Sequence, residues 1–146
     1  MALTKLTNTG AITAALTPTT LAKAISSKGA RAGQSVIITD RANGVFVYTE
    51  GQTTNGYNIV ACTGVTTLAL VLKVLGRVDA IQFGAIGDGV TDNTNAFIAA
   101  QAVEKNIFVP YTNNSFLIDT PYSLNPKTTL YGDGVVKFTN AQVGVF

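Results

Sequence analysis

The stretch from Gln82 to Gln101, QFGAIGDGVTDNTNAFIAAQ, constrains the fold more than any other part of the sequence. Gly84, Gly87 and Gly89 permit backbone angles that other residues rarely adopt. The Asp88-Gly89 step is a strong turn signal, and the residues after it have the composition of a helix. The stretch therefore predicts a tight glycine-rich loop that runs directly into a helix.

The helix is expected from Thr91 to about Lys105. Thr91 is the predicted N-cap, with its hydroxyl accepting a hydrogen bond from a backbone N–H one turn on. Asp92 would lie in the first turn, where the helix dipole favours a carboxylate by ~0.3–1 kcal/mol. One face of the predicted helix carries small residues, which would let the helix lie close against a flat surface, and Phe97 lies at its flank. This face consists of Ala96, Ala99, Ala100 and Val103.

Three chemical interpretations compete with this structural one. The glycine spacing is not G-x-G-x-x-G, and no βαβ unit follows, so a dinucleotide loop is disfavoured. A phosphate loop needs Lys and Ser/Thr at the helix start, where the sequence has Asp92-Asn93. Asp88 and Asp92 remain conceivable as a carboxylate pair for sugar hydrolysis, although the turn and the cap already explain both.

Residues 1–33 form a Thr/Ala-rich segment with apolar residues at intervals. Within it, TPTTLAKAISSKG predicts a short helix with Thr17 as cap, Pro18 at the first position and Gly29 after the end. A helix of about ten residues is marginal alone in water, so it must dock on its own domain or on a partner chain. Its apolar residues, which the resemblance described below makes the candidate attachment residues, are Leu3, Leu6, Ile12, Leu16, Leu21 and Ile25.

Residues 34–76 predict a small antiparallel β-domain. SVIITD and GVFVYTE are β-branched and aromatic runs, and Asn43-Gly44 between them is a hairpin signal. YNIVA and LALVLKV follow as two further strands. Four short strands bury only a thin core, so a free monomer would be marginal.

Residues 77–146 begin with the strand-like run VDAIQF, and short strands separated by turns follow the helix. Such evenly punctuated strands are typical of β-solenoid turns. The expected strands are IFVP, SFLID, YSLNP, TTLYGDG and VVKF.

The composition argues against several chemistries. The chain has no His, the commonest general base and metal ligand. Its lone Cys62 forms no disulfide within the chain and is expected to be a small buried hydrophobe. After Lys105 the acids are Asp119 and Asp133, too few for a lyase or hydrolase site. We therefore predict no catalytic residue, cofactor or metal site in this segment. The net charge of +2 also gives no reason to expect nucleic-acid binding or membrane insertion.

The motif FGAIGDGVTDNTNAFIAAQ resembles the signature that opens right-handed parallel β-helices of the pectate-lyase-like superfamily, especially those of bacteriophage tailspikes. IFVPYTNNSFLI and LNPKTTLYGDG are similar to that family's following coils, and GVFVYTE to GRVDAIQFGA is similar to the small β-domain that precedes them. Asn93 stands where the family often has Asp, and Ile86 where it often has Lys; we expect neither change to affect the turn or the cap.

The resemblance implies a mainly β fold: a small N-terminal antiparallel β-domain, then a capping α-helix and the first coils of a right-handed parallel β-helix. The expected domains are 1–33 for attachment, 34–76 as the virion-anchoring β-domain and 77–146 as the capping helix and β-helix start. The capping motif would be Gly84, Gly87, Asp88, Gly89, Thr91 and Asp92.

By the same resemblance, the chain is the N-terminal part of a phage tailspike and a homotrimeric virion component. It would bind phage tail, baseplate or adaptor proteins through its N-terminus. Bacterial surface polysaccharide would bind through a region after Phe146, and the full-length protein would be an adhesin or a depolymerase. The alternative is the N-terminal part of a pectate-lyase-like polysaccharide lyase or glycoside hydrolase.

Overall fold

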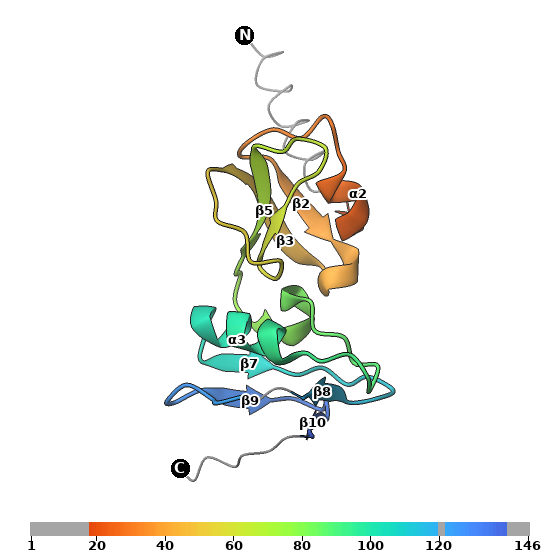
Figure 1. The fold of residues 1–146 in the computed structure, drawn as a ribbon, viewed down its shortest axis with the longest axis vertical. Coiled ribbons are helices and arrows are strands. Elements are labelled where there is room, and N and C mark those ends of the chain that lie inside the picture. Colours follow the sequence, from red (N-terminus) through yellow and green to blue (C-terminus); the bar gives the residue numbers. More distant parts are fainter. Residues whose placement is uncertain (1–17, 120–121, 140–146) are drawn as a thin grey trace. The chain divides into compact units, whose positions relative to one another are not determined.

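The computed structural model of the protein describes residues 18–119 and 122–139. The chain divides into two compact units, Met1–Val74 and Leu75–Phe146 (Figure 1). Each unit has a core of its own, built around Phe46 and Leu70 in the first and around Phe97 and Phe116 in the second.

The first unit is a five-stranded sheet with the order β1-β2-β3-β5-β4. All its pairings are antiparallel except that of β1 with β2, which is parallel. The four predicted strands are confirmed, and β1 is an addition. The strands are β1 (Pro18–Thr19), β2 (Ser35–Ile38), β3 (Gly44–Glu50), β4 (Ile59–Ala61) and β5 (Leu68–Lys73).

Alternation along the strands produces the core of this sheet. Val36 and Ile38 on β2 and Phe46 and Tyr48 on β3 are buried, while the residues between them are half-buried. This is the period-two pattern of a sheet with one covered face. Cys62, 5% exposed, is buried as predicted.

The hairpin between β2 and β3 turns through a short 3-10 helix, η1 (Thr39–Arg41). Ala42 and Asn43 follow with φ of 50° and 55°, both in the left-handed region. Asn tolerates that region far better than Ala. The Asn-Gly signal therefore located the hairpin, but the two left-handed positions lie one residue earlier than it implies, because Gly44 is the first residue of β3.

The predicted N-terminal helix is shorter than expected: α2 spans Leu21–Ile25. Thr20 caps it by accepting a hydrogen bond from the N–H of Lys23, and Pro18 lies in β1 instead of in the helix. The pairing of β1 with β2 extends the backbone that the prediction placed in the first turn. The predicted cap, Thr17, lies outside the described residues.

The helix α2 docks on its own unit, which is the first of the two alternatives predicted for it. The Tyr48 hydroxyl donates to the carbonyl of Ala24 at 2.8 Å, and Ala24 is 3% exposed. The N–H groups of Thr63 and Gly64 both donate to the carbonyl of Ile25. These bonds satisfy carbonyls that a helix end otherwise leaves without partners.

The second unit consists of short parallel strands and two helical segments (Figure 1). The strands are β6 (Val78–Asp79), β7 (Asn106–Phe108), β8 (Phe116–Ile118), β9 (Thr129–Tyr131) and β10 (Val136–Phe138), with η2 (Ala80–Phe83), a 3-10 helix, and α3 (Thr94–Val103).

These strands form two stacks in which the chain returns to the same sheet after each circuit. In one stack, Val78 pairs with Ile107 and Ile107 with Leu130, all parallel. In the other, Asp92 forms a parallel bridge to Leu117, which pairs with Lys137. The segments between β6 and β10 thus alternate between two parallel stacks.

Two of the strands predicted for this unit do not form as expected. VDAIQF is a strand only at Val78–Asp79, because the Asp79 carboxylate accepts from the N–H of Ile81 and starts η2. YSLNP forms no strand; the Gln101 side chain accepts from the N–H of Asn125 and donates to the carbonyl of Ser123 instead. In both places a side chain takes the backbone groups that a strand would have paired.

Within the described residues, none of the helices is long and apolar enough to cross a lipid bilayer.

Candidate functional site: the loop and helix over the parallel strands

The glycine-rich loop closes around the Asp88 carboxylate. Oδ1 of Asp88 accepts hydrogen bonds from the backbone N–H groups of Val90 and Thr91, at 2.9 and 2.8 Å. Oδ2 accepts from the Thr91 hydroxyl at 2.6 Å. Thr91 is thus a donor to this turn. Its predicted role as helix N-cap is wrong, because the N–H groups of Asn93 and Thr94 donate to Leu117 and Asp92 instead.

These hydrogen bonds keep Asp88 ionised. The Thr91 hydroxyl bond, followed by the two backbone N–H bonds, lowers the pKa of Asp88 to about 2. A carboxyl with so low a pKa holds no proton at neutral pH and cannot serve as the general acid of a hydrolase pair. Its role here is that of a turn residue.

Asp92 marks the start of the helix, although it precedes the first turn. Its Oδ1 accepts from the N–H of Thr94 at 3.0 Å and from the Thr94 hydroxyl at 2.5 Å. The same oxygen accepts a hydrogen bond, at 3.1 Å, from the N–H of Asp119, a residue 27 positions further along the chain. Asp92 therefore does the capping assigned to Thr91 and also ties the helix start to the following coil.

Asn93, which the prediction treated as neutral, is the most connected side chain of the loop. It is 2% exposed, and its Nδ2 donates to the carbonyls of Ile86, Thr91 and Leu117 at 3.0, 2.9 and 3.2 Å. Its Oδ1 accepts from the N–H of Ile86 at 2.6 Å. An Asp at this position could not donate to three carbonyls, so the amide determines how the loop is held.

The buried side of α3 is narrower than predicted. Ala96 and Ala100 are buried and Phe97 is fully buried, but Ala99 is half-buried and Val103 is 45% exposed. The Phe97 ring contacts Phe116 edge-to-face, with ring centroids 6.2 Å apart. The side of the helix that packs inward therefore includes two alanines and one aromatic ring.

The loop also lies very close to the next coil. A Cβ at Gly87 would come within 2.6 Å of Thr112 Cγ2 and 2.8 Å of Thr112 Cβ. The N–H of Gly89, whose φ is 80°, donates to the carbonyl of Ser115 at 2.9 Å. Gly87 is needed for space, whereas Gly89 is needed for its left-handed backbone.

The predicted site residues thus fall into two groups. Gly84, the residue after η2 with φ of 87°, joins Gly87, Asp88, Gly89, Thr91 and Asp92 in one connected loop. Of the candidate attachment residues, Leu21 and Ile25 are half-buried on α2. The remaining four, Leu3, Leu6, Ile12 and Leu16, lie outside the described residues.

Residues 18–119 and 122–139 contain no group of three His, Cys, Asp or Glu side chains arranged to hold a metal ion. Sequence reasoning also missed two residues that contact the loop: Leu117, whose carbonyl accepts from Asn93, and Thr112, which packs against Gly87. No local signal could have found them, because both lie a full coil further along the chain.

The fold and this loop define a class: a mainly β chain in which a capped helix rests on short parallel strands. No family model and no curated protein matches the sequence. Solved structures do match, and several are phage tailspikes. The chain has a tailspike-like fold.

Three of these structures show the extent of the similarity. Tailspike protein gp49 from Acinetobacter baumannii bacteriophage Fri1, a capsular polysaccharide depolymerase, is 15% identical with a TM-score of 0.62, over 81% of this chain and 23% of that one. The enzymatically active domain of bacteriophage CBA120 tailspike protein 2 is 21% identical with a TM-score of 0.53, over 79% and 18%. The Acinetobacter baumannii phage AM24 tailspike is 24% identical with a TM-score of 0.50, over 73% and 20%. This chain spans about a fifth of the length of these proteins.

Proposed function

We propose that the chain is the N-terminal, virion-anchoring part of a phage tailspike. Residues 1–76 attach the spike to the phage tail, and residues 77–146 begin a right-handed parallel β-helix that α3 caps. The observation that carries the proposal is the pair of parallel stacks, in which residues 78, 107 and 130 and residues 92, 117 and 137 return to the same sheets.

The position of α3 supports a capping role. Among residues 18–119 and 122–139, the first strand of one stack, β6, pairs only with β7, so one of its edges has no strand partner there. An open strand edge invites pairing with another chain, and terminal elements of solenoids cover such edges. The helix α3 contacts both β7 and η2, the segment that continues β6, and so lies at this end of the stack.

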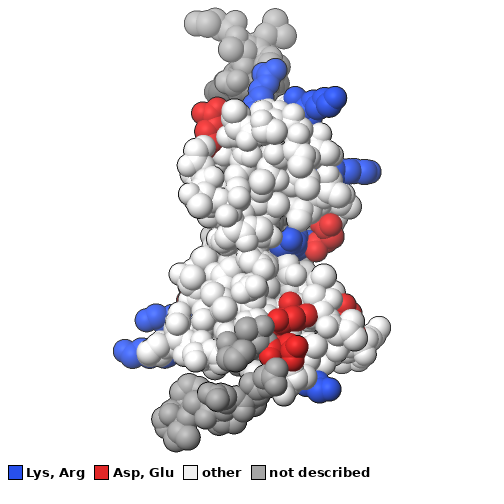
Figure 2. Space-filling view, viewed as in Figure 1, with Lys and Arg blue, Asp and Glu red and all other residues white. Residues whose placement is uncertain are grey.

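Tailspike architecture also accounts for the low charge of the surface. Lys, Arg, Asp and Glu are 12% of the residues, and most of the surface drawn in Figure 2 is uncharged. A surface so poor in charge suits a chain that buries much of its area against copies of itself and against tail proteins. We propose a homotrimer in the virion, with surface polysaccharide bound by parts of the full protein outside the described residues.

Binding to phage tails tests the anchoring role. The whole chain is mixed with spike-less tails of the phage that encodes it. We expect the chain to co-sediment with these tails and to block re-attachment of intact spikes. Leu3→Ser with Leu6→Ser should abolish binding. Leu75→Ser with Ile98→Ser, an equal change at two exposed positions of the second unit, should leave it intact. Failure of the unaltered chain to bind spike-less tails would remove the anchoring assignment.

A further inference from the structure

Large exposed apolar side chains gather where the loops of the second unit stack. We call this surface the loop corner and define it as residues 86–90, 110–114 and 133–135. Among its residues, Val90 is 76% exposed, Tyr111 71% and Val135 60%. Isolated exposed apolar residues are ordinary, but a group of them on adjoining loops marks an interaction surface.

The three loops adjoin one another along the stack. Gly87 packs against the Thr112 side chain, and the N–H of Gly134 donates to the carbonyl of Val109 at 3.0 Å. The apolar residues therefore form a strip that crosses successive coils. Covering such a strip needs a partner that lies alongside the stack, not one that closes its end.

The loop corner is also acidic. Asp88 and Asp133 lie on its first and third loops, and Arg77 forms its ion pair with Asp79, outside the loop corner. Lys137 lies nearby, in the middle of β10. An apolar strip with two carboxylates favours a partner surface that carries cations.

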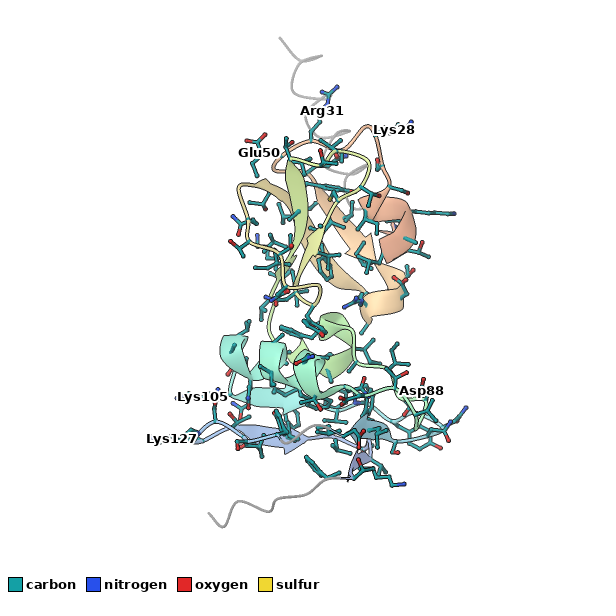
Figure 3. All side chains as sticks on the ribbon, in the orientation of Figure 1. Lys28, Arg31, Glu50, Asp88, Lys105 and Lys127 are labelled. Carbon is teal, nitrogen blue, oxygen red and sulfur yellow. The ribbon has the colours of Figure 1, made fainter. Side chains whose placement is uncertain are left out.

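Such a surface exists on the opposite side of the same unit. We call it the lysine corner and define it as residues 124–128 with Lys105. Lys105 and Lys127 are exposed and precede β7 and β9, and the N–H of Thr129 donates to the carbonyl of Lys105 at 2.7 Å. Figure 3 shows both lysines at one edge of the unit and Asp88 at the other. The neighbouring Glu104 carboxylate is engaged by the N–H groups of Lys105 and Asn106.

The lysine corner also offers apolar surface beside its two cations. Residues 124–128 line a shallow hollow, and Leu124 and Pro126 supply its apolar wall.

We infer that copies of this chain associate side by side, with the loop corner of one copy seated on the lysine corner of the next. This inference rests on the proposed homotrimer and specifies its contact. Tyr111 and Val90 enter the hollow, and Asp88 and Asp133 meet Lys105 and Lys127. Because two different surfaces meet, the contact is head-to-tail, which is the kind of contact that a closed ring of three copies uses. Pairing of two loop corners would instead bring like charges together.

Charge exchange between the two corners tests the inference on the whole chain. Tyr111→Lys places a cation against the lysine corner, and Lys105→Glu with Lys127→Glu reverses the corner itself. Each change should weaken association at least tenfold in light scattering and sedimentation equilibrium. The triple variant, which contains both changes, should recover most of the association. All three positions are exposed in the single chain, so circular dichroism should be unchanged.

A matched control carries the same change in net charge elsewhere. Lys28→Glu with Lys73→Glu, both at exposed positions of the first unit, should leave association unaltered. Added salt should weaken association of the unaltered chain, because the charges meet near solvent. A trimer that tolerates both corner variants would overturn this contact and leave the proposed trimer standing. An unaltered chain that stays monomeric at all concentrations would overturn both.

Discussion

The side-chain amide of Asn93 and its backbone N–H donate to the same acceptor, the carbonyl oxygen of Leu117, at 3.2 and 2.8 Å. These two residues are 24 positions apart, and the pair joins the start of α3 to β8. The loop, the helix and the next coil therefore depend on one buried amide.

Replacing that amide with a carboxylate should destabilise the second unit. In Asn93→Asp, the side chain would face the carbonyls of Ile86, Thr91 and Leu117 with no proton to donate. We expect a loss of about 3 kcal/mol or more, the range for charged groups buried without a partner. Asn95→Asp, at an exposed position of the first helical turn, is the control and should be neutral. Calorimetry would contradict the prediction if the two variants unfolded at the same temperature.

The titration of Asp88 should follow from its contact with Thr91. Because the folded-state pKa is lowered to about 2, ionisation of Asp88 stabilises the loop above the ordinary pKa of 3.8. That stabilisation is lost as the pH falls from 3.8 through 2. The carboxyl carbon shift of Asp88 in an NMR titration should therefore have its midpoint near 2.

Removing the Thr91 hydroxyl should move that midpoint. Thr91→Val deletes the largest cause of the low pKa of Asp88, so the midpoint should rise toward 3.8. Thr94→Val is the control, since the Thr94 hydroxyl donates to Asp92 instead. An Asp88 midpoint that did not respond to Thr91→Val would show that the backbone N–H groups alone hold the carboxylate.

Substitution of Gly87 should test the close approach between two coils. Its φ is not in the left-handed region, so Gly87→Ala costs only the overlap with Thr112, about 1–3 kcal/mol. Thr112→Ala removes Cγ2 and Oγ1 and should restore part of the loss in the double variant. Gly29→Ala, with nothing within 4 Å of the new methyl, should not destabilise the chain. Equal effects of the Gly87 and Gly29 changes in urea denaturation would refute this account.

The hairpin of the first unit should gain stability from a glycine. Ala42 has a φ of 50°, a conformation that costs an L-residue roughly 1–2 kcal/mol. Ala42→Gly should therefore raise the free energy of unfolding by up to about 1 kcal/mol, after the entropy that glycine adds to the unfolded chain. Ala22→Gly, at an exposed position within α2, should lower it by about the same amount. Opposite signs in thermal denaturation are the expected result.

Several elements were predictable because their signals are local. The Asn43-Gly44 step lies between two β-branched runs and forms the hairpin of β2 and β3. The loop from Gly84 to Gly89 and the helix after it also form where the sequence predicts. In each case the determining contacts join residues only a few positions apart, so composition and spacing are sufficient.

The cap of α3 shows where this reasoning ends. Thr91, Asp92 and Asn93 all have side chains that can cap a helix, and sequence preference alone favoured Thr91. The structure assigns Thr91 to Asp88, Asp92 to Thr94 and Asn93 to Leu117. Local propensity could not rank these choices, because the acceptor that holds Asn93 belongs to the next coil.

The sequence by itself determined where most strands and turns lie, which glycines form the loop and where the helix lies. Only the tertiary structure decided which side chains hold the loop, that 122–126 is not a strand, and that apolar residues line one corner of the stack. The physical reason is distance along the chain. The contacts between coils join residues about 20 to 30 positions apart, and they exist only once successive coils have stacked.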